Sequence, residues 1–82
     1  MNNNYFELIA KRMVLQEIEK ELKKEIRRED VFTVWMTKVL QNNKAIFGSV
    51  LTDDLYEITY NGDKNEFYID KYQKIENKKV II

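Results

Sequence analysis

Two alternating runs of apolar residues flank an Asn-Gly pair within residues 55–70, and this stretch constrains the fold more than any other. The pair at 61–62 tolerates the positive φ angles that a tight β-hairpin turn requires. A two-residue loop would set Tyr56 opposite Phe67, whereas a four-residue loop would set Ile58 opposite Phe67. Because side chains alternate along a strand, both loops place the same apolar residues on one face. The stretch therefore predicts an antiparallel hairpin with a single apolar face.

The first third of the chain predicts one long helix over residues 4–28. Asn4 suits the N-cap position, and Glu7 lies three residues further on, which is the spacing of a capping box. A row of aliphatic residues recurs at the helical period and is expected to face the sheet. This row consists of Leu8, Leu15, Ile18, Leu22 and Ile26.

A second group of apolar residues lies on another side of the same helix. These residues are Tyr5, Phe6, Ile9 and Met13. A helix that rests on one sheet needs a single apolar stripe, so the second group needs its own explanation. Either the first helical turns enter the core or pass beneath a C-terminal strand, or the group contacts another chain. In the latter case these four residues form a self-association surface.

The remainder of the chain predicts strands joined by short polar turns. Residues 31–40 carry apolar side chains on both faces of the expected strand, which is typical of a central strand or of one that is covered on both sides. A tight turn at Asn42–Asn43 would start the next strand. In that strand Gly48 would leave room for the ring of Trp35.

The expected architecture is a single α+β domain over residues 1–82, in which the helix packs on a four-stranded or five-stranded antiparallel meander. The sheet occupies about residues 31–72, and residues 79–82 form a short terminal strand or a tail. Every connection is short, so the topology needs no crossover. One helix covers only one face of such a sheet, although residues 31–40 are apolar on both. We therefore expect a homodimer or a higher homo-oligomer.

The chain lacks cysteine and histidine, and its 14 basic residues balance its 14 acidic residues. It therefore has no thiolate nucleophile, no disulfide framework, and neither the usual general base nor the commonest zinc ligand. Its two glycines form no phosphate-binding loop. Carboxylates on a solvent-facing strand surface are ordinary. We therefore expect no catalytic residue, no metal ion and no cofactor, and the sequence does not predict an enzyme.

Membrane insertion and secretion are not indicated. No apolar run approaches the roughly 18–20 residues that a membrane span needs. The first residues also lack the basic and apolar regions of a signal peptide. We expect a cytoplasmic protein with no membrane partner.

Residues 34–74 resemble a family of small uncharacterised proteins that are carried by phages and prophages of Gram-positive bacteria. The matching residues are Trp35, Lys38, Leu40-Gln41-Asn42-Asn43-Lys44-Ala45, Tyr56-Glu57-Ile58-Thr59-Tyr60-Asn61-Gly62-Asp63-Lys64, Glu66, Tyr68, Asp70, Tyr72 and Lys74. The chain departs from the family at Asp53-Asp54, where relatives often carry Asp-Gly. The resemblance implies an accessory phage protein in the cytoplasm of the infected bacterium. Such a protein would bind a host protein, a component of antiviral defence, and inhibit it by occupancy.

Candidate partner-binding residues lie on the strand that follows the Asn-Gly turn. Tyr68 and Tyr72 should share a face there with Glu66 and Asp70, opposite the apolar face. This arrangement offers ring area for burial, hydroxyls for hydrogen bonds and carboxylates for a basic partner. The alternative is that the two tyrosines merely cover the outer side of the sheet.

A second functional hypothesis is the binding of a nucleotide-like ligand or a short nucleic acid. Aromatic residues on a sheet can stack on bases, and lysines can hold phosphates. The residues available for such a site are Trp35, Lys38, Lys44, Tyr60 and Lys64. Against this hypothesis, the zero net charge provides no general attraction for a polyanion.

Overall fold

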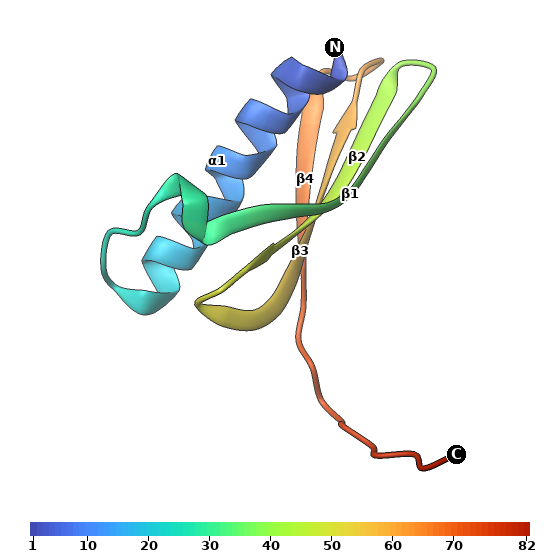
Figure 1. The fold of residues 1–82 in the computed structure, drawn as a ribbon. Coiled ribbons are helices and arrows are strands. Elements are labelled where there is room, and N and C mark those ends of the chain that lie inside the picture. The colour runs from blue at the N-terminus through green and yellow to red at the C-terminus, as the bar shows by residue number, and fades with distance from the viewer.

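A computed structural model describes all 82 residues and shows one helix packed against one antiparallel sheet (Figure 1). The four strands are hydrogen-bonded in chain order as a meander, β1-β2-β3-β4. The elements are α1 (Asn3–Leu22), the 3-10 turn η1 (Arg28–Asp30), β1 (Val31–Val39), β2 (Asn42–Ser49), β3 (Thr52–Asn61) and β4 (Glu66–Tyr72). The expected α+β architecture is confirmed, with four strands and not five.

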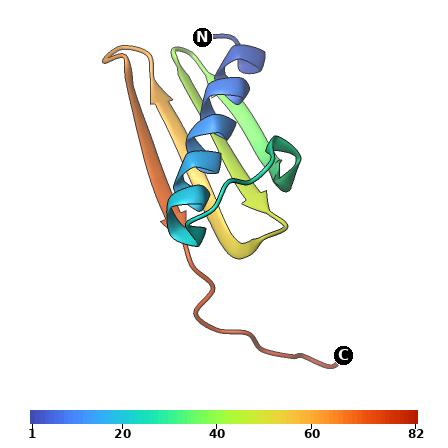
Figure 2. The same cartoon turned by 90° about the vertical axis from the view of Figure 1, so that its left-hand side faces the viewer.

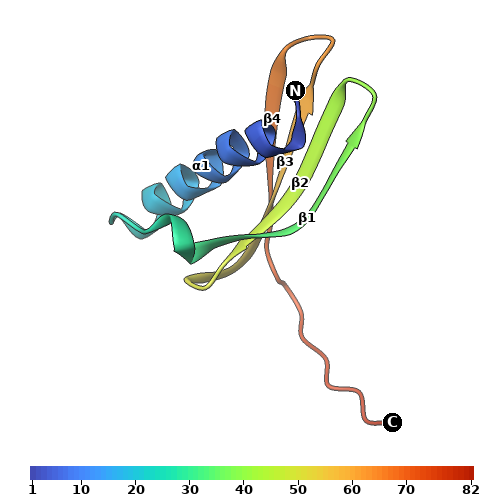
Figure 3. The same ribbon diagram turned by 45° about the horizontal axis from the view of Figure 1, so that its top comes forward.

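The sheet is covered on one side only. Figure 2 shows α1 lying along one face of all four strands. No helix or strand lies over the opposite face, as Figure 3 shows. Residues 73–82 leave the end of β4 as a tail without regular secondary structure, and this tail runs away from the sheet (Figure 1).

The helix is shorter than the sequence predicts, and it begins earlier. Its N-cap is Asn2, whose side-chain oxygen accepts a hydrogen bond from the Tyr5 backbone N–H at 2.8 Å, so the prediction of Asn4 is wrong. The helix ends because Lys23 adopts the left-handed conformation, with φ 56°. The Glu19 side chain then accepts the Ile26 backbone N–H at 3.1 Å, which satisfies a donor in the connection back to the sheet.

The buried stripe of α1 also differs from the predicted one. Its members lie four residues apart and are at most 1% exposed: Phe6, Ala10, Val14 and Ile18. Of the predicted row, Ile18 belongs to this stripe. Leu15 and Ile26 pack partly against the core, whereas Leu8 and Leu22 are 57% and 39% exposed. The small Ala10 side chain lets the helix backbone approach the sheet closely, which explains why the stripe passes through it. The predicted row therefore overlaps the buried side of the helix only in part.

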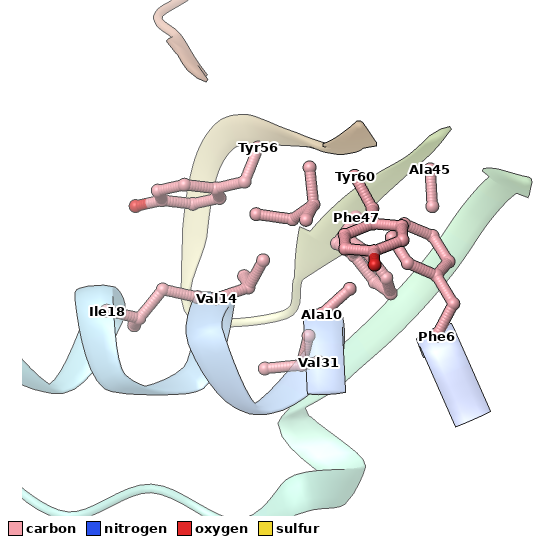
Figure 4. Packing of buried hydrophobic residues seen from close by; sticks show 10 residues of the cluster. Phe6, Ala10, Val14, Ile18, Val31, Ala45, Phe47, Tyr56 and Tyr60 are labelled. Carbon is pink, nitrogen blue, oxygen red and sulfur yellow. The ribbon is translucent and has the colours of Figure 1, made fainter. Parts of the chain in front are cut away.

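The core lies between α1 and the inner face of the sheet (Figure 4). The sheet contributes Val31, Ala45, Phe47, Tyr56, Ile58 and Tyr60. The ring of Phe67 on β4 stacks on Phe6 at a centroid distance of 6.2 Å and tilts against Tyr60 at 4.8 Å. A large apolar side chain such as Phe47 or Ile58 stabilises the fold by about 1.5–3 kcal/mol when it is fully buried.

The β3–β4 hairpin has the predicted face but not the predicted register. Asn61 pairs with Glu66, so the four-residue loop begins at Gly62, and Ile58 lies opposite Ile69. The Asn61 side chain accepts the backbone N–H groups of residues 63 and 64 and thereby organises the loop. The residue with positive φ is Asn65, at 54°, and not the Asn-Gly pair.

Gly62 serves a different purpose from the predicted one, because it allows two loops to approach. A Cβ atom at Gly62 would lie 2.2 Å from the backbone oxygen of Gln41 in the β1–β2 loop. The Gly62 N–H donates to the Asn42 side-chain oxygen at 3.2 Å across the same contact. The predicted turn at Asn42–Asn43 is therefore wrong, and the turn lies at Leu40–Gln41.

Asn43 explains why that turn lies two residues earlier than predicted. Its side chain is 0% exposed and donates to the Met1 backbone oxygen at 3.1 Å and to the Asn3 side-chain oxygen at 3.2 Å. These bonds tie β2 to the start of α1, so Asn43 must lie inside the sheet and not at a turn.

Candidate functional site

The face of the sheet opposite α1 is the strongest candidate for a functional surface, and we call it the open face. Its large side chains are Phe32, Trp35, Ile46, Leu55, Tyr68 and Tyr72. Apart from the half-buried Ile46, each is between 40% and 52% exposed. A contiguous apolar surface of this kind on a small domain marks an interaction site more often than chance exposure does.

A bulge in β1 creates the aromatic half of the open face. The pairing with β2 shifts between Thr33 and Trp35, so Val34 is the extra residue and Trp35 lies opposite Ile46. The bulge places Phe32 and Trp35 on the same face although they are three residues apart. The sequence of residues 31–40 indicates that β1 carries apolar side chains on both faces, but it does not indicate the bulge.

Gly48 lies beneath one of these rings. A Cβ atom there would meet the ring of Phe32 at 2.8 Å and the Leu55 side chain at 3.5 Å. The ring that needs the space is therefore Phe32, and the predicted partner Trp35 is wrong because Trp35 pairs with Ile46.

The acidic half of the open face lies on β3 and β4. Tyr68 and Tyr72 share this face with Glu66 and Asp70, as expected for that strand, and the two rings are 43% and 52% exposed. The Tyr68 hydroxyl donates to the Glu66 carboxylate, and this hydrogen bond raises the pKa of Tyr68. The negative charge of Glu57 and its hydrogen bond with the Tyr72 hydroxyl, at 3.2 Å, raise the pKa of Tyr72.

The charges on this half are not balanced within the domain. Glu57 lies directly opposite Asp70 across β3 and β4, and like charges in that position destabilise a sheet. Glu57 has one ion-pair partner, Lys44, whose Nζ lies 3.9 Å from a Glu57 carboxylate oxygen, and Asp70 has none. With Glu66, three carboxylates on this surface face one ammonium group. A basic partner would therefore find an attractive surface here.

The residues of the ligand hypothesis do not converge on one site. Trp35 and Lys44 lie on the open face, but Tyr60 is 8% exposed in the core and donates to the Asn65 side chain at 2.7 Å. Lys38 pairs with the inward-facing Asn43 and so lies on the other side of the sheet from Trp35. Lys64 lies in the β3–β4 loop. The geometry provides no common site for these five side chains.

The group expected to mediate self-association is divided by the fold. Phe6 is 0% exposed and belongs to the core, and Met13 packs partly against that core. Ile9 is half-buried, whereas Tyr5 is 57% exposed. The first explanation left open by the sequence, that the first helical turns enter the core, holds for Phe6 and Met13. These four residues are therefore not a continuous surface for another chain.

Sequence reasoning missed a polar cluster where the end of α1 meets the sheet. Lys71 on β4 lies 2.7 Å from a Glu21 carboxylate oxygen and 3.4 Å from one of Asp54. The buried Tyr56 donates its hydroxyl to the same Glu21 oxygen at 3.3 Å. Burial raises the pKa of Tyr56 to about 12. These contacts join α1, β3 and β4, and they require a three-dimensional juxtaposition that no spacing in the sequence reveals.

A hollow of about 580 Å³ lies along α1 beside η1. It is lined by Leu8, Ile9, Lys11, Arg12, Leu15, Gln16, Glu19 and Arg28. Three of these residues are cationic. The hollow lies on the helix side of the molecule, away from the open face.

Two further properties bear on function. No three acidic side chains converge in a way that could hold a metal ion. No helix has the length and apolar character that a membrane span requires.

Comparison with known proteins gives one match. Residues 6–82 match a family described as a family of unknown function, DUF6275. Neither a curated protein nor a solved structure matches the chain. The family match extends well beyond the 34–74 resemblance seen in the sequence and includes most of α1.

Proposed function

The chain belongs to DUF6275, a family of unknown function, and we propose that it is a protein-binding module and not an enzyme. Its binding surface is the open face of the sheet. The observation that carries the proposal is an exposed aromatic and aliphatic surface with a surplus of carboxylates beside it. Aromatic side chains dominate the binding energy of protein interfaces.

The chemistry of the open face defines the partner. Phe32, Trp35 and Leu55 supply apolar area, and Glu57, Glu66 and Asp70 supply negative charge. The complementary segment carries aliphatic or aromatic residues with lysine or arginine beside them. The ligand hypothesis has no comparable support, because its residues do not share a site.

The resemblance to phage-borne proteins supports a biological setting for this proposal. In that setting the protein acts in the cytoplasm of an infected bacterium and binds a host protein of antiviral defence. Inhibition would follow from occupancy of the host protein, since the open face offers exposed aromatic area and charge for a protein contact.

The test uses a partner recovered by co-purification and then purified by itself. The double variant Tyr68→Ser/Tyr72→Ser should keep its stability within about 1 kcal/mol, because both rings are about half exposed. Calorimetry should show its affinity for the partner reduced about tenfold or more, as for loss of two interface aromatics. Tyr5→Ser on α1 is the matched control and should bind as the parent does. Unchanged affinity in the double variant would remove the open face from the binding site.

A further inference from the structure

The tail that follows β4 has the same chemistry as the expected partner segment. Ile75, Val80 and Ile81 are 94%, 79% and 83% exposed, and they contact no core. The tail also carries Lys74, Lys78 and Lys79 against the single acid Glu76. It is therefore an aliphatic and basic segment attached to a domain whose open face is aromatic and acidic.

The course of the tail favours contact with another molecule over its own sheet. It leaves β4 after Tyr72 and continues beyond the end of the sheet in all three views (Figures 1–3). The tail thus leaves its own open face uncovered. A second copy can receive this outstretched tail on its own open face.

The dimensions of the open face and the length of the tail are also consistent with contact between two copies. Four strands and about seven residues give the open face dimensions of about 19 Å by 23 Å, or roughly 440 Å². A stable interface usually buries about 800 Å² on each partner, so contact between two open faces alone is small. A ten-residue tail reaches up to about 33 Å when extended, which is enough to cross a neighbouring sheet and add the missing area.

We propose that two copies of this chain form a twofold dimer in which the tail of each lies across the open face of the other, with Lys78 and Lys79 beside the carboxylates of β3 and β4 and residues 80–82 on the aromatic half. The contact is isologous, so both tails are used and the assembly closes at two copies. The tail thereby occupies the surface assigned above to the partner. That last statement rests on the proposed function, and a partner would have to displace the tail.

Oligomeric mass tests the dimer without any partner. Light scattering during gel filtration should give a dimer for the full chain at micromolar concentration and a monomer for a chain shortened to residues 1–73. A monomeric full chain, or a shortened chain that remains dimeric, would overturn the proposal. Circular dichroism should show the same helix and sheet in both chains, because the tail contributes no regular structure.

A charge exchange tests whether the contact is between copies. The tail variant Lys78→Glu/Lys79→Glu and the face variant Glu66→Lys/Asp70→Lys should each raise the dimer dissociation constant about tenfold or more. An equimolar mixture should recover the dimer, since each tail then meets a face of opposite charge. The control Arg12→Glu/Lys20→Glu, on exposed positions of α1, should leave the dimer intact. If the mixture stays monomeric, the tail does not bind the open face of a second copy.

The same variants separate this proposal from the proposed function. The shortened chain is measured with the purified partner by calorimetry. Tighter binding than for the full chain supports displacement of the tail. If the shortened chain is monomeric and binds no partner, the dimer stands and the proposed function fails.

Discussion

Substitution of Gly62 by alanine should be far more costly than the same change at Gly48, although both residues lie in the sheet region. At Gly62 the new Cβ atom would meet a backbone oxygen, that of Gln41, at 2.2 Å. Backbone cannot rotate aside, so the two loops must separate by about 1 Å or more. Their separation would also break the hydrogen bond from the Gly62 N–H to Asn42.

The steric overlap and the lost hydrogen bond together determine how much Gly62→Ala destabilises the fold. Overpacking of this kind costs about 1–3 kcal/mol, and a lost hydrogen bond costs about 0.5–1.5 kcal/mol. We expect Gly62→Ala to reduce the free energy of unfolding by about 2–4 kcal/mol, a large part of the stability of a domain of this size. At Gly48 the obstacle is the ring of Phe32, which can turn toward solvent, so the expected loss is about 1 kcal/mol or less.

Urea denaturation followed by circular dichroism measures both variants against the parent. The slope of the transition should be unchanged, because the same surface is exposed on unfolding. If Gly62→Ala lies within about 0.5 kcal/mol of the parent, the two loops do not pack as described. A larger loss at Gly48 than at Gly62 would contradict the reasoning in the same way.

Two further predictions concern the helix start and a buried phenol. Because Asn2 is the N-cap, Asn2→Ala should reduce the free energy of unfolding by about 1 kcal/mol and lower the melting temperature. Asn4→Ala should have little effect. Equal losses of stability in the two variants would contradict the assignment of Asn2 as the N-cap. Ultraviolet titration should show one tyrosine ionising near pH 12, and Tyr56→Phe should remove it. Because the pKa of Tyr56 in the folded state is raised above its usual value of 10, its contribution is complete below pH 10 and is lost as the pH rises toward about 12. Stability that is unchanged across that interval would show that Tyr56 is not buried as described.

The sequence predicts which residues share a face of the sheet better than it predicts which residues are paired. Alternation depends only on the period of a strand, so the sequence assigns Ile58 and Tyr68 to the correct faces. Register depends on tertiary contacts, here those of Asn43 with the start of α1 and of Gly62 with Gln41. Neither contact leaves a periodic signal.

The helix also shows that tertiary contacts limit what the sequence predicts. Its existence follows from periodicity, but its end is set by the left-handed Lys23 and by the Glu19 side chain that accepts the Ile26 N–H. Its buried side is set by how closely Ala10 can approach the sheet, and that choice favoured a smaller residue over the exposed Leu8. Burial against a particular surface overrides the ranking of hydrophobic residues.

For the candidate site, the contribution of β4 was predictable and that of β1 was not. The alternation of Glu66, Tyr68, Asp70 and Tyr72 is visible in the sequence, and the structure places all four on the open face. Phe32 joins Trp35 on this face only because of the bulge at Val34. A bulge of this kind has no glycine or proline to mark it.

Site-specific photo-crosslinking tests the central claim, that the open face contacts a protein partner, most directly. A photoreactive amino acid is placed at Trp35 or Tyr68 on the open face and, as controls, at Tyr5 or Arg12 on α1, all of which are exposed. Crosslinked products from the producing cell are identified by mass spectrometry. Both open-face positions should capture the same partner, and neither control position should capture it. Capture of that partner from the α1 positions, with none from Trp35 or Tyr68, would contradict it.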